Sequence, residues 1–176
     1  EEVVSSVNAG TTRLEEPELA ELLSNVVASG CLTASDTPGL ADIYVISVPT
    51  PIGEHNRPVL DFVQSVSEAV GKVLRQGNLV ILESTVPPGT TDGLVRRRLE
   101  AASGLTVGDG FGLAHCPERV LPGQIMREIV ENDRIVGASD NRAGEQAANL
   151  YRSFVTGEIF ITDAITAELA KLSENI

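Results

Sequence analysis

Three polar residues near the end of the chain have types and a spacing that could support acid–base chemistry. Glu168, Lys171 and Asn175 recur at i, i+3 and i+7, so on an α-helix they form one polar stripe. A desolvated lysine can act as a base, and an asparagine can hydrogen-bond a substrate or an oxyanion. The same spacing is typical of a solvated helix face, so both interpretations stay open.

Two hydroxyl-bearing loops, each stiffened by proline, are a second candidate site. Thr50 lies between two prolines, whose rings fix φ and remove two amide donors, and its hydroxyl is expected to be free. Thr85 lies in the segment 83–89, Glu-Ser-Thr-Val-Pro-Pro-Gly, which we expect to lead into a helix N-terminus that favours an anionic ligand. Ordinary turn formation or helix capping would explain both threonines equally well.

A third loop, residues 115–123, places Glu118 beside Arg119 between two prolines. Such neighbours can form an ordinary surface ion pair, but the surrounding prolines and glycine favour a rigid presentation. Because neighbouring side chains on a strand point to opposite faces, His115 and Cys116 are not expected to form a catalytic pair. We expect Cys116 to be a packing residue.

Strands and helices in alternation must position these loops. Two nearly continuous apolar runs, 43–48 and 79–82, are typical of parallel strands covered on both faces. Shorter strands are expected at 111–116, 134–137 and 159–161, and helices at 17–28, 61–74, 90–99, after Asp140 and after Asp163. The last helix has an apolar stripe at positions 165, 169, 172 and 176. This order predicts an α/β fold with a parallel sheet, in which ligands bind at the carboxyl ends of strands.

Composition restricts the class of function. The 176 residues include 13 Lys plus Arg and 25 Asp plus Glu, a net charge of −12, which argues against nucleic-acid binding and against docking on anionic membranes. The arginines at 96–98 are expected on a solvated helix face. With no bilayer-spanning stretch, no signal peptide and two distant cysteines, we expect a cytoplasmic protein without disulfides or a metal site.

Five motifs follow one another along the chain: 41–51 (Ala-Asp-Ile to Val-Pro-Thr-Pro), 82–91 (Leu-Glu-Ser-Thr-Val-Pro-Pro-Gly-Thr-Thr), 117–123 (Pro-Glu-Arg-Val-Leu-Pro-Gly), 132–137 (Asn-Asp-Arg-Ile-Val-Gly) and 162–175. This series resembles the nucleotide-sugar dehydrogenase family, also called the UDP-glucose/GDP-mannose dehydrogenases, over residues 3–175. The third motif is similar to the branch that acts on UDP-N-acetylmannosamine or UDP-N-acetylglucosamine. The resemblance implies a homodimeric enzyme that uses NAD to oxidise the C6 alcohol of a UDP-N-acetylhexosamine to the uronate in two hydride transfers.

The resemblance also implies roles for individual residues. Thr50 and Thr85 match contacts with NAD, and Glu118 matches a glutamate implicated in thioester hydrolysis. Lys171 matches the lysine that handles the proton or charge of the C6 oxygen. The residues that match substrate contacts are Glu118, Arg119, Val120, Lys171 and Asn175. We therefore expect Lys171 and Asn175 to face the same cleft as Glu118 and Arg119.

Two parts of the family pattern do not occur in this sequence. There is no Gly-x-Gly-x-x-Gly, since the glycines at 108, 110 and 112 have the wrong spacing. The nucleophilic cysteine of the family lies beyond position 175, in a C-terminal domain. We expect a fragment, inactive by itself and weak in NAD binding, with a partial dinucleotide-binding domain at 1–162 and the start of a connecting helix at 163–176.

Other hypotheses stay open. The chain could be a non-catalytic Rossmann-like binding or regulatory module, a UDP-glucose 6-dehydrogenase, or a dehydrogenase of the hydroxy-acid type, although the third motif is not expected in the last. A further expectation concerns strand 43–48, because a free strand edge leaves amides and carbonyls unpaired. Either residues 1–36 or another chain covers this edge, or the sequence belongs to a longer molecule.

Overall fold

The structure is a computed structural model that describes residues 1–14, 16, 18–121 and 123–174. Five strands form one sheet in chain order, with β1–β2, β2–β3 and β4–β5 parallel. The strands are β1 (Ile43–Ile46), β2 (Leu79–Leu82), β3 (Gly112–His115), β4 (Arg134–Ala138) and β5 (Ile159–Thr162). This architecture confirms the expected α/β fold with a mostly parallel, Rossmann-like sheet.

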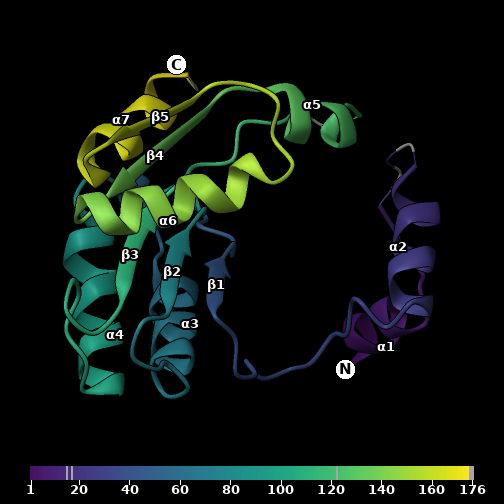
Figure 1. Cartoon of the computed structure of the whole chain (residues 1–176), viewed down its shortest axis with the longest axis horizontal. Helices are drawn as coiled ribbons and strands as arrows, with labels where there is room; N and C mark the ends of the chain where they lie inside the picture. Colours follow the sequence, from purple (N-terminus) through teal and green to yellow (C-terminus); the bar gives the residue numbers. More distant parts are fainter. Residues whose placement is uncertain (15, 17, 122, 175–176) are drawn as a thin grey trace.

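One strand pair, β3–β4, is antiparallel. A strand that pairs in parallel with the preceding strand requires a crossover connection, which returns the chain to the end of the sheet where the preceding strand began. Here the connection contains α5 (Ile125–Glu131), which lies beyond the end of the sheet and not across a face (Figure 1). Strand β4 therefore starts at the end of the sheet where β3 finishes and runs in the opposite direction. The sheet is mixed, whereas we expected a parallel sheet.

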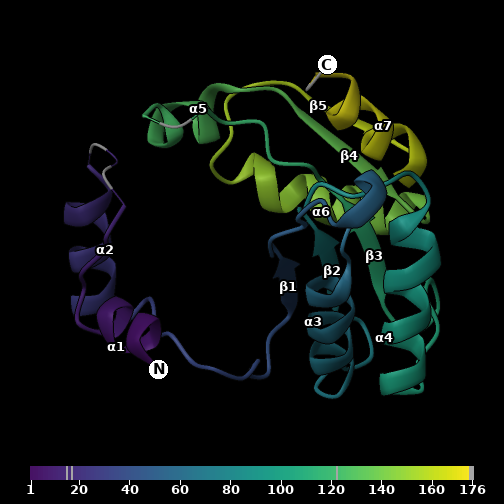
Figure 2. The same cartoon turned by 180° about the vertical axis from the view of Figure 1, so that it is seen from behind.

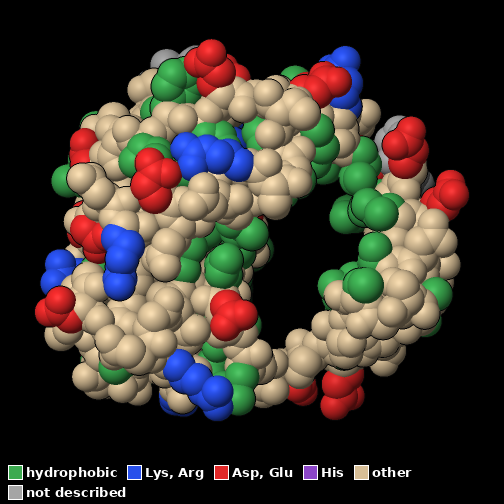
Figure 3. Space-filling model, viewed as in Figure 1, with side chains coloured by type: hydrophobic (Ala, Val, Ile, Leu, Met, Phe, Trp, Pro, Cys, Tyr) green, Lys and Arg blue, Asp and Glu red, His purple; other side chains and the backbone are tan. Residues whose placement is uncertain are grey.

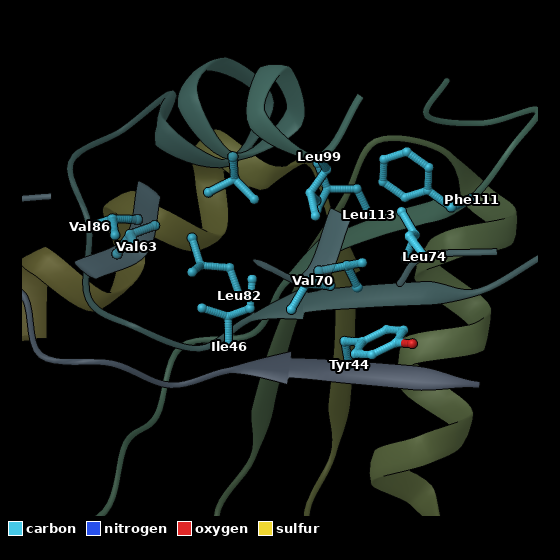
Figure 4. Close-up of a cluster of buried hydrophobic side chains, with 12 residues drawn as sticks. Tyr44, Ile46, Val63, Val70, Leu74, Leu82, Val86, Leu99, Phe111 and Leu113 are labelled. Atoms are coloured by element: carbon cyan, nitrogen blue, oxygen red, sulfur yellow. The ribbon is translucent and has the colours of Figure 1, made fainter. Parts of the chain in front are cut away.

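Helices cover the two faces of the sheet. One face carries α3 (Asp61–Gly71), α4 (Arg96–Ser103), the π-helical turn η2 (Thr91–Val95) before it, and α7 (Ala164–Glu174), and the other face carries α6 (Asn141–Arg152). The side chains of β2 alternate between two buried clusters, with Val80 and Leu82 in the first and Leu79 and Ile81 in the second. Figure 4 shows the first cluster.

Strand β1 is covered on one face only, contrary to the expectation for the run 43–48. Tyr44 and Ile46 are buried under α3, whereas Ile43 and Val45 are 36% and 47% exposed. The reason is that α6 packs across β2 to β5. Residues 43–46 are therefore apolar although the described residues of this chain cover only one face of the strand.

The first part of the chain forms an arm of α1 (Glu2–Asn8) and α2 (Leu19–Ala28), joined to β1 by an extended segment (Figure 2). In the described part of the chain, the arm does not cover the free edge of β1, the first strand of the sheet. A hole separates the arm from the sheet, with hydrophobic side chains on both sides of it (Figure 3). At the arm's far end, the Glu16 carboxylate accepts a hydrogen bond of 2.7 Å from the Gly123 amide.

Helix α7 begins where the sequence predicts, because the Asp163 carboxylate accepts hydrogen bonds from the amide and hydroxyl of Thr166. Its orientation differs from the prediction. The buried side is formed by Ala164, Ala167 and Glu168, whereas Ile165 and Leu169 of the apolar stripe are each 47% exposed. Among the described residues, no helix combines the length and apolar character of a membrane span.

Candidate functional site

The loops that follow β1 and β2 are joined by hydrogen bonds at the carboxyl ends of these strands. The Ser84 hydroxyl accepts from the Val48 amide and donates to the Val48 carbonyl, each at 2.8 Å. The Thr50 hydroxyl donates to the Thr85 carbonyl at 2.7 Å. The two threonines expected to contact a cofactor therefore lie together. We expected the Thr50 hydroxyl to be free, but it donates this hydrogen bond. Its oxygen can still accept a hydrogen bond.

Glu168 connects α7 to the second of these loops. Its carboxylate accepts hydrogen bonds from the Gly89 amide at 2.5 Å, the Thr91 amide at 2.8 Å and the Thr91 hydroxyl at 2.6 Å. The residue is 1% exposed, so it does not belong to a solvated face. Lys171, one turn further along α7, is half-buried. Asn175 lies outside the described residues.

The loop after β3 contacts the other end of α7. Arg119 forms an ion pair with Glu174, which lies one turn beyond Lys171. The Arg119 carbonyl also accepts a hydrogen bond of 3.1 Å from the Asn132 side chain. Lys171 therefore lies between two residues of α7 that contact the loops expected to bind cofactor and substrate. Within the described residues, no hydrogen bond or ion pair joins Lys171 to Glu118.

Glu118 is held by the residues around it. One carboxylate oxygen accepts a hydrogen bond of 2.6 Å from the Arg119 amide, and the other lies 3.4 Å from the Arg134 guanidinium. Arg134 is 1% exposed, donates to the Ile129 carbonyl at 3.1 Å and lies 5.4 Å from the centre of the Tyr151 ring. Val120 continues the same loop and is half-buried.

A buried polar cluster lies next to this loop. The Tyr151 hydroxyl donates to the Glu83 carboxylate at 2.8 Å. Burial raises the pKa of Glu83, and the nearby Glu118 charge adds to this effect, while Tyr151 and Arg134 oppose it. Burial also raises the pKa of Cys116 to about 11. Because the thiolate is the nucleophile, Cys116 is inert, as expected of a packing residue.

His115 points away from Cys116. It lies opposite Gly137 in the antiparallel pair, so the two share a face of the sheet. A Cβ on Gly137 would lie 2.7 Å from Ala164 and Ala167 of α7, which identifies this face. Cys116 packs instead in the cluster under α6. Burial lowers the pKa of His115 to about 4. The hydrogen bond with the Leu82 backbone raises this pKa, but by less than burial lowers it.

Three residues of this site, Glu83, Arg134 and Tyr151, were not singled out from the sequence. Glu83 and Arg134 lie within the quoted motifs, and an arginine in a short apolar strand is itself an indication of a buried partner. Tyr151 has no such indication, because its position on the apolar face of α6 predicts only packing. Its contact with Glu83 spans 68 residues and depends on the fold.

The arrangement fits one part of a dinucleotide. Such ligands bind at the carboxyl ends of parallel strands, where Thr50 and Thr85 are both partly exposed. The glycines at 108, 110 and 112 lie at the amino end of β3, opposite to the carboxyl ends of β1 and β2, because Gly112 begins β3. They therefore do not form a phosphate-binding loop at this site.

Known proteins match the chain over nearly its whole length. The family model "UDP-glucose/GDP-mannose dehydrogenase family, NAD binding domain" matches residues 1–155. A UDP-N-acetyl-D-mannosamine dehydrogenase of Campylobacter jejuni is 46% identical over 98% of this chain, which covers 44% of that protein. An NDP-N-acetyl-D-galactosaminuronic acid dehydrogenase of Ralstonia solanacearum is 42% identical over 98% of this chain and 42% of its own length.

A solved structure gives the same result. The UDP-D-ManNAc dehydrogenase of Pyrococcus horikoshii superposes with a TM-score of 0.94 at 41% identity, over 99% of this chain and 42% of that chain. This chain thus spans less than half the length of each of these three relatives. The matched model also confirms NAD as the expected cofactor. The chain belongs to the UDP-glucose/GDP-mannose dehydrogenase family and corresponds to its NAD binding domain.

Proposed function

We propose that this chain is part of an NAD-dependent UDP-sugar 6-dehydrogenase. The substrate is a UDP-N-acetylhexosamine, UDP-ManNAc or UDP-GlcNAc, whose C6 alcohol is oxidised to the uronate in two hydride transfers. The observation that carries the proposal is the arrangement of α7, which contacts both strand-end loops and holds Lys171 between the contacts. The names of the relatives, which refer to N-acetylated sugars, support this substrate class.

Each residue has a chemical task in this proposal. Thr50 and Thr85 hold NAD, which accepts hydride when it is bound. Lys171 takes the proton of the C6 hydroxyl or neutralises the charge on its oxygen, and Asn175 hydrogen-bonds the lysine. Arg119 and Val120 contact the sugar nucleotide.

Glu118 serves the hydrolytic step. Its carboxylate is an acceptor whose two oxygens meet the Arg119 amide and the Arg134 guanidinium. A carboxylate fixed in this way can orient a water molecule for attack on an acyl carbon. Each oxygen keeps a lone pair that can accept a hydrogen bond from water.

We further propose that residues 1–162 form a partial dinucleotide-binding domain and that α7 starts a connecting helix of a homodimeric enzyme. The 176 residues by themselves are inactive in this proposal. The Gly-x-Gly-x-x-Gly fingerprint and the family's cysteine nucleophile do not occur among them.

The proposal is tested on the parent protein, meaning the full-length gene product that contains this chain. NADH formation is followed with NAD and UDP-ManNAc, UDP-GlcNAc or UDP-glucose. We expect NADH with an N-acetylated sugar. Oxidation of UDP-glucose alone would identify a UDP-glucose 6-dehydrogenase, and no NADH with any of the three would favour a non-catalytic binding module.

A further inference from the structure

The contact between Glu168 and the loop 83–91 joins parts of the chain that are 77 to 79 residues apart. Both carboxylate oxygens are engaged, Oε2 by the Gly89 amide and Oε1 by the amide and hydroxyl of Thr91. All three partners are donors, which suits a carboxylate because it can only accept. A buried carboxylate needs such partners, since an unpaired one is very costly to bury.

The two amides that donate hydrogen bonds to Glu168 lie at the start of a helical segment. The first amides of a helix lack partners within it, and they favour a negative charge nearby. Thr90, at the N-cap of η2, provides no side-chain hydrogen bond to the helix. Glu168 therefore supplies the cap from another element. The φ of Gly89 is +83°, a conformation that a residue with a side chain rarely adopts, so glycine permits the backbone turn in which this amide meets Glu168.

The loop is held at its other end as well. Ser84 is bound to the Val48 backbone, and Thr50 is bound to the Thr85 carbonyl. Thr85 thus lies between an attachment to the β1 loop and an attachment to α7. If the second attachment is lost, the loop is free to move at the end nearer to α7.

On the other side of the contact, α7 packs closely against the sheet. Gly137 of β4 leaves no room for a Cβ beneath Ala164 and Ala167. Glu168 lies in the next position of α7, and Lys171 lies one turn later on the same side. The sheet therefore sets the distance of α7 from β4, and Glu168 sets its relation to the loop 83–91.

We infer that Glu168 is a positioning residue: it fixes the spacing between the loop that carries Thr85 and the turn of α7 that carries Lys171. This inference rests on the proposed function, in which Thr85 holds the cofactor and Lys171 acts on the substrate hydroxyl. Glu168 itself touches neither in this assignment. Its effect on the reaction is exerted through the two elements that it joins.

The contact is tested first without reference to activity. In the parent protein, Glu168→Gln replaces one acceptor oxygen by an amide group that donates. We expect the amide that faces the new NH2 group, either Gly89 or Thr91, to exchange with deuterated water at least about tenfold faster, the effect of one lost hydrogen bond to a charged group. Glu158→Gln makes the same change of charge at an exposed site and should leave exchange at both amides unchanged. Unchanged exchange in Glu168→Gln would overturn the inference.

The effect on positioning is tested by kinetics with sugar deuterated at C6. We expect Glu168→Gln to lower kcat roughly 10- to 100-fold, the range expected for a small misplacement of reacting groups. The isotope effect on kcat should rise, because hydride transfer becomes slower than product release. A variant that merely lost part of its folded population would keep the wild-type isotope effect, and that result would contradict the inference.

Thr91 provides a matched pair of variants. Thr91→Val removes the hydroxyl donor to Glu168 and should reproduce a smaller part of both effects, whereas Thr91→Ser keeps the hydroxyl and should restore wild-type values. Equal behaviour of the two would overturn the assignment. If the wild-type parent forms no NADH with the three sugars, the proposed function fails, and the exchange of the two amides still decides whether Glu168 fixes the loop.

Discussion

The loops that follow β2 and β3 are held in different ways. Loop 83–91 is attached by hydrogen bonds to backbone groups and by the Glu168 carboxylate, which is 1% exposed. Loop 117–121 is attached by the ion pairs of Glu118 and Arg119 and by a hydrogen bond from Asn132, and in the pair between Arg119 and Glu174 the side chains are 29% and 35% exposed. The first attachment is protected from solvent, and the second is partly open to it.

This difference teaches how one helix can serve two tasks. Buried hydrogen bonds keep a fixed geometry, whereas partly exposed ion pairs are weakened by salt and can exchange partners. Helix α7 meets the first loop through Glu168 and the second through Glu174, with Lys171 between them. We therefore expect the cofactor side of the site to be preformed and the substrate side to adjust.

The largest effect is expected from Lys171→Ala, which removes the group between the two attachments and leaves both of them intact. Turnover of the parent protein should fall by about 10²- to 10⁴-fold, the usual contribution of an acid–base group. Thermal unfolding should change little, because Lys171 is only half-buried. Lys72→Ala, at the exposed residue that directly follows α3, is the control. Unchanged turnover would remove Lys171 from the mechanism.

The next effect is expected from Arg134→Met, which removes the buried partner of Glu118. The change eliminates an ion pair, a hydrogen bond to Ile129 and the contact with the Tyr151 ring. We expect the free energy of unfolding to fall by about 3 kcal/mol, the upper value for the loss of a hydrogen bond to a charged group. Denaturant titration measures it, with exposed Arg152→Met as the control. Equal losses in both variants would show that Arg134 does not anchor this loop.

A pH effect should arise from His115, the last residue of β3, two positions before the loop 117–121. Its folded pKa of about 4 lies below the ordinary value of 6.5, so the unfolded chain binds a proton more readily. The contribution of neutral His115 to the free energy of unfolding is therefore fully present above pH 6.5. It decreases by about 3 kcal/mol as the pH falls toward 4. His115→Leu should flatten this part of the stability profile. A slope that persists in the variant would assign it to another group.

The smallest effect sharpens the comparison between the loops. Arg119→Ala removes the partly exposed ion pair with Glu174 and should lower the free energy of unfolding by less than about 1 kcal/mol. In the wild type, raising the salt concentration should speed amide exchange in 117–121 but not at Gly89 or Thr91. If both loops respond equally to salt, the distinction between them is wrong.

Local patterns in the sequence determined much of this protein. Residues 79–82 alternate into two cores as expected, α6 and α7 begin after Asp140 and Asp163, and His115 and Cys116 face opposite sides. Each of these features depends on side-chain period or on a cap a few residues away. The motifs likewise indicated the family without any knowledge of the fold.

Only the tertiary structure decided which partner each element meets. The spacing of Glu168, Lys171 and Asn175 is the same on a solvated face and on a buried one, and the structure buries Glu168 because unpaired amides lie opposite it. Ile165 and Leu169 of α7 are each 47% exposed because small residues, not large ones, fit against Gly137. The direction of β4 follows from a connection that never crosses the sheet. Sequence periodicity defines the sides of an element, and packing against distant residues selects the side that is buried.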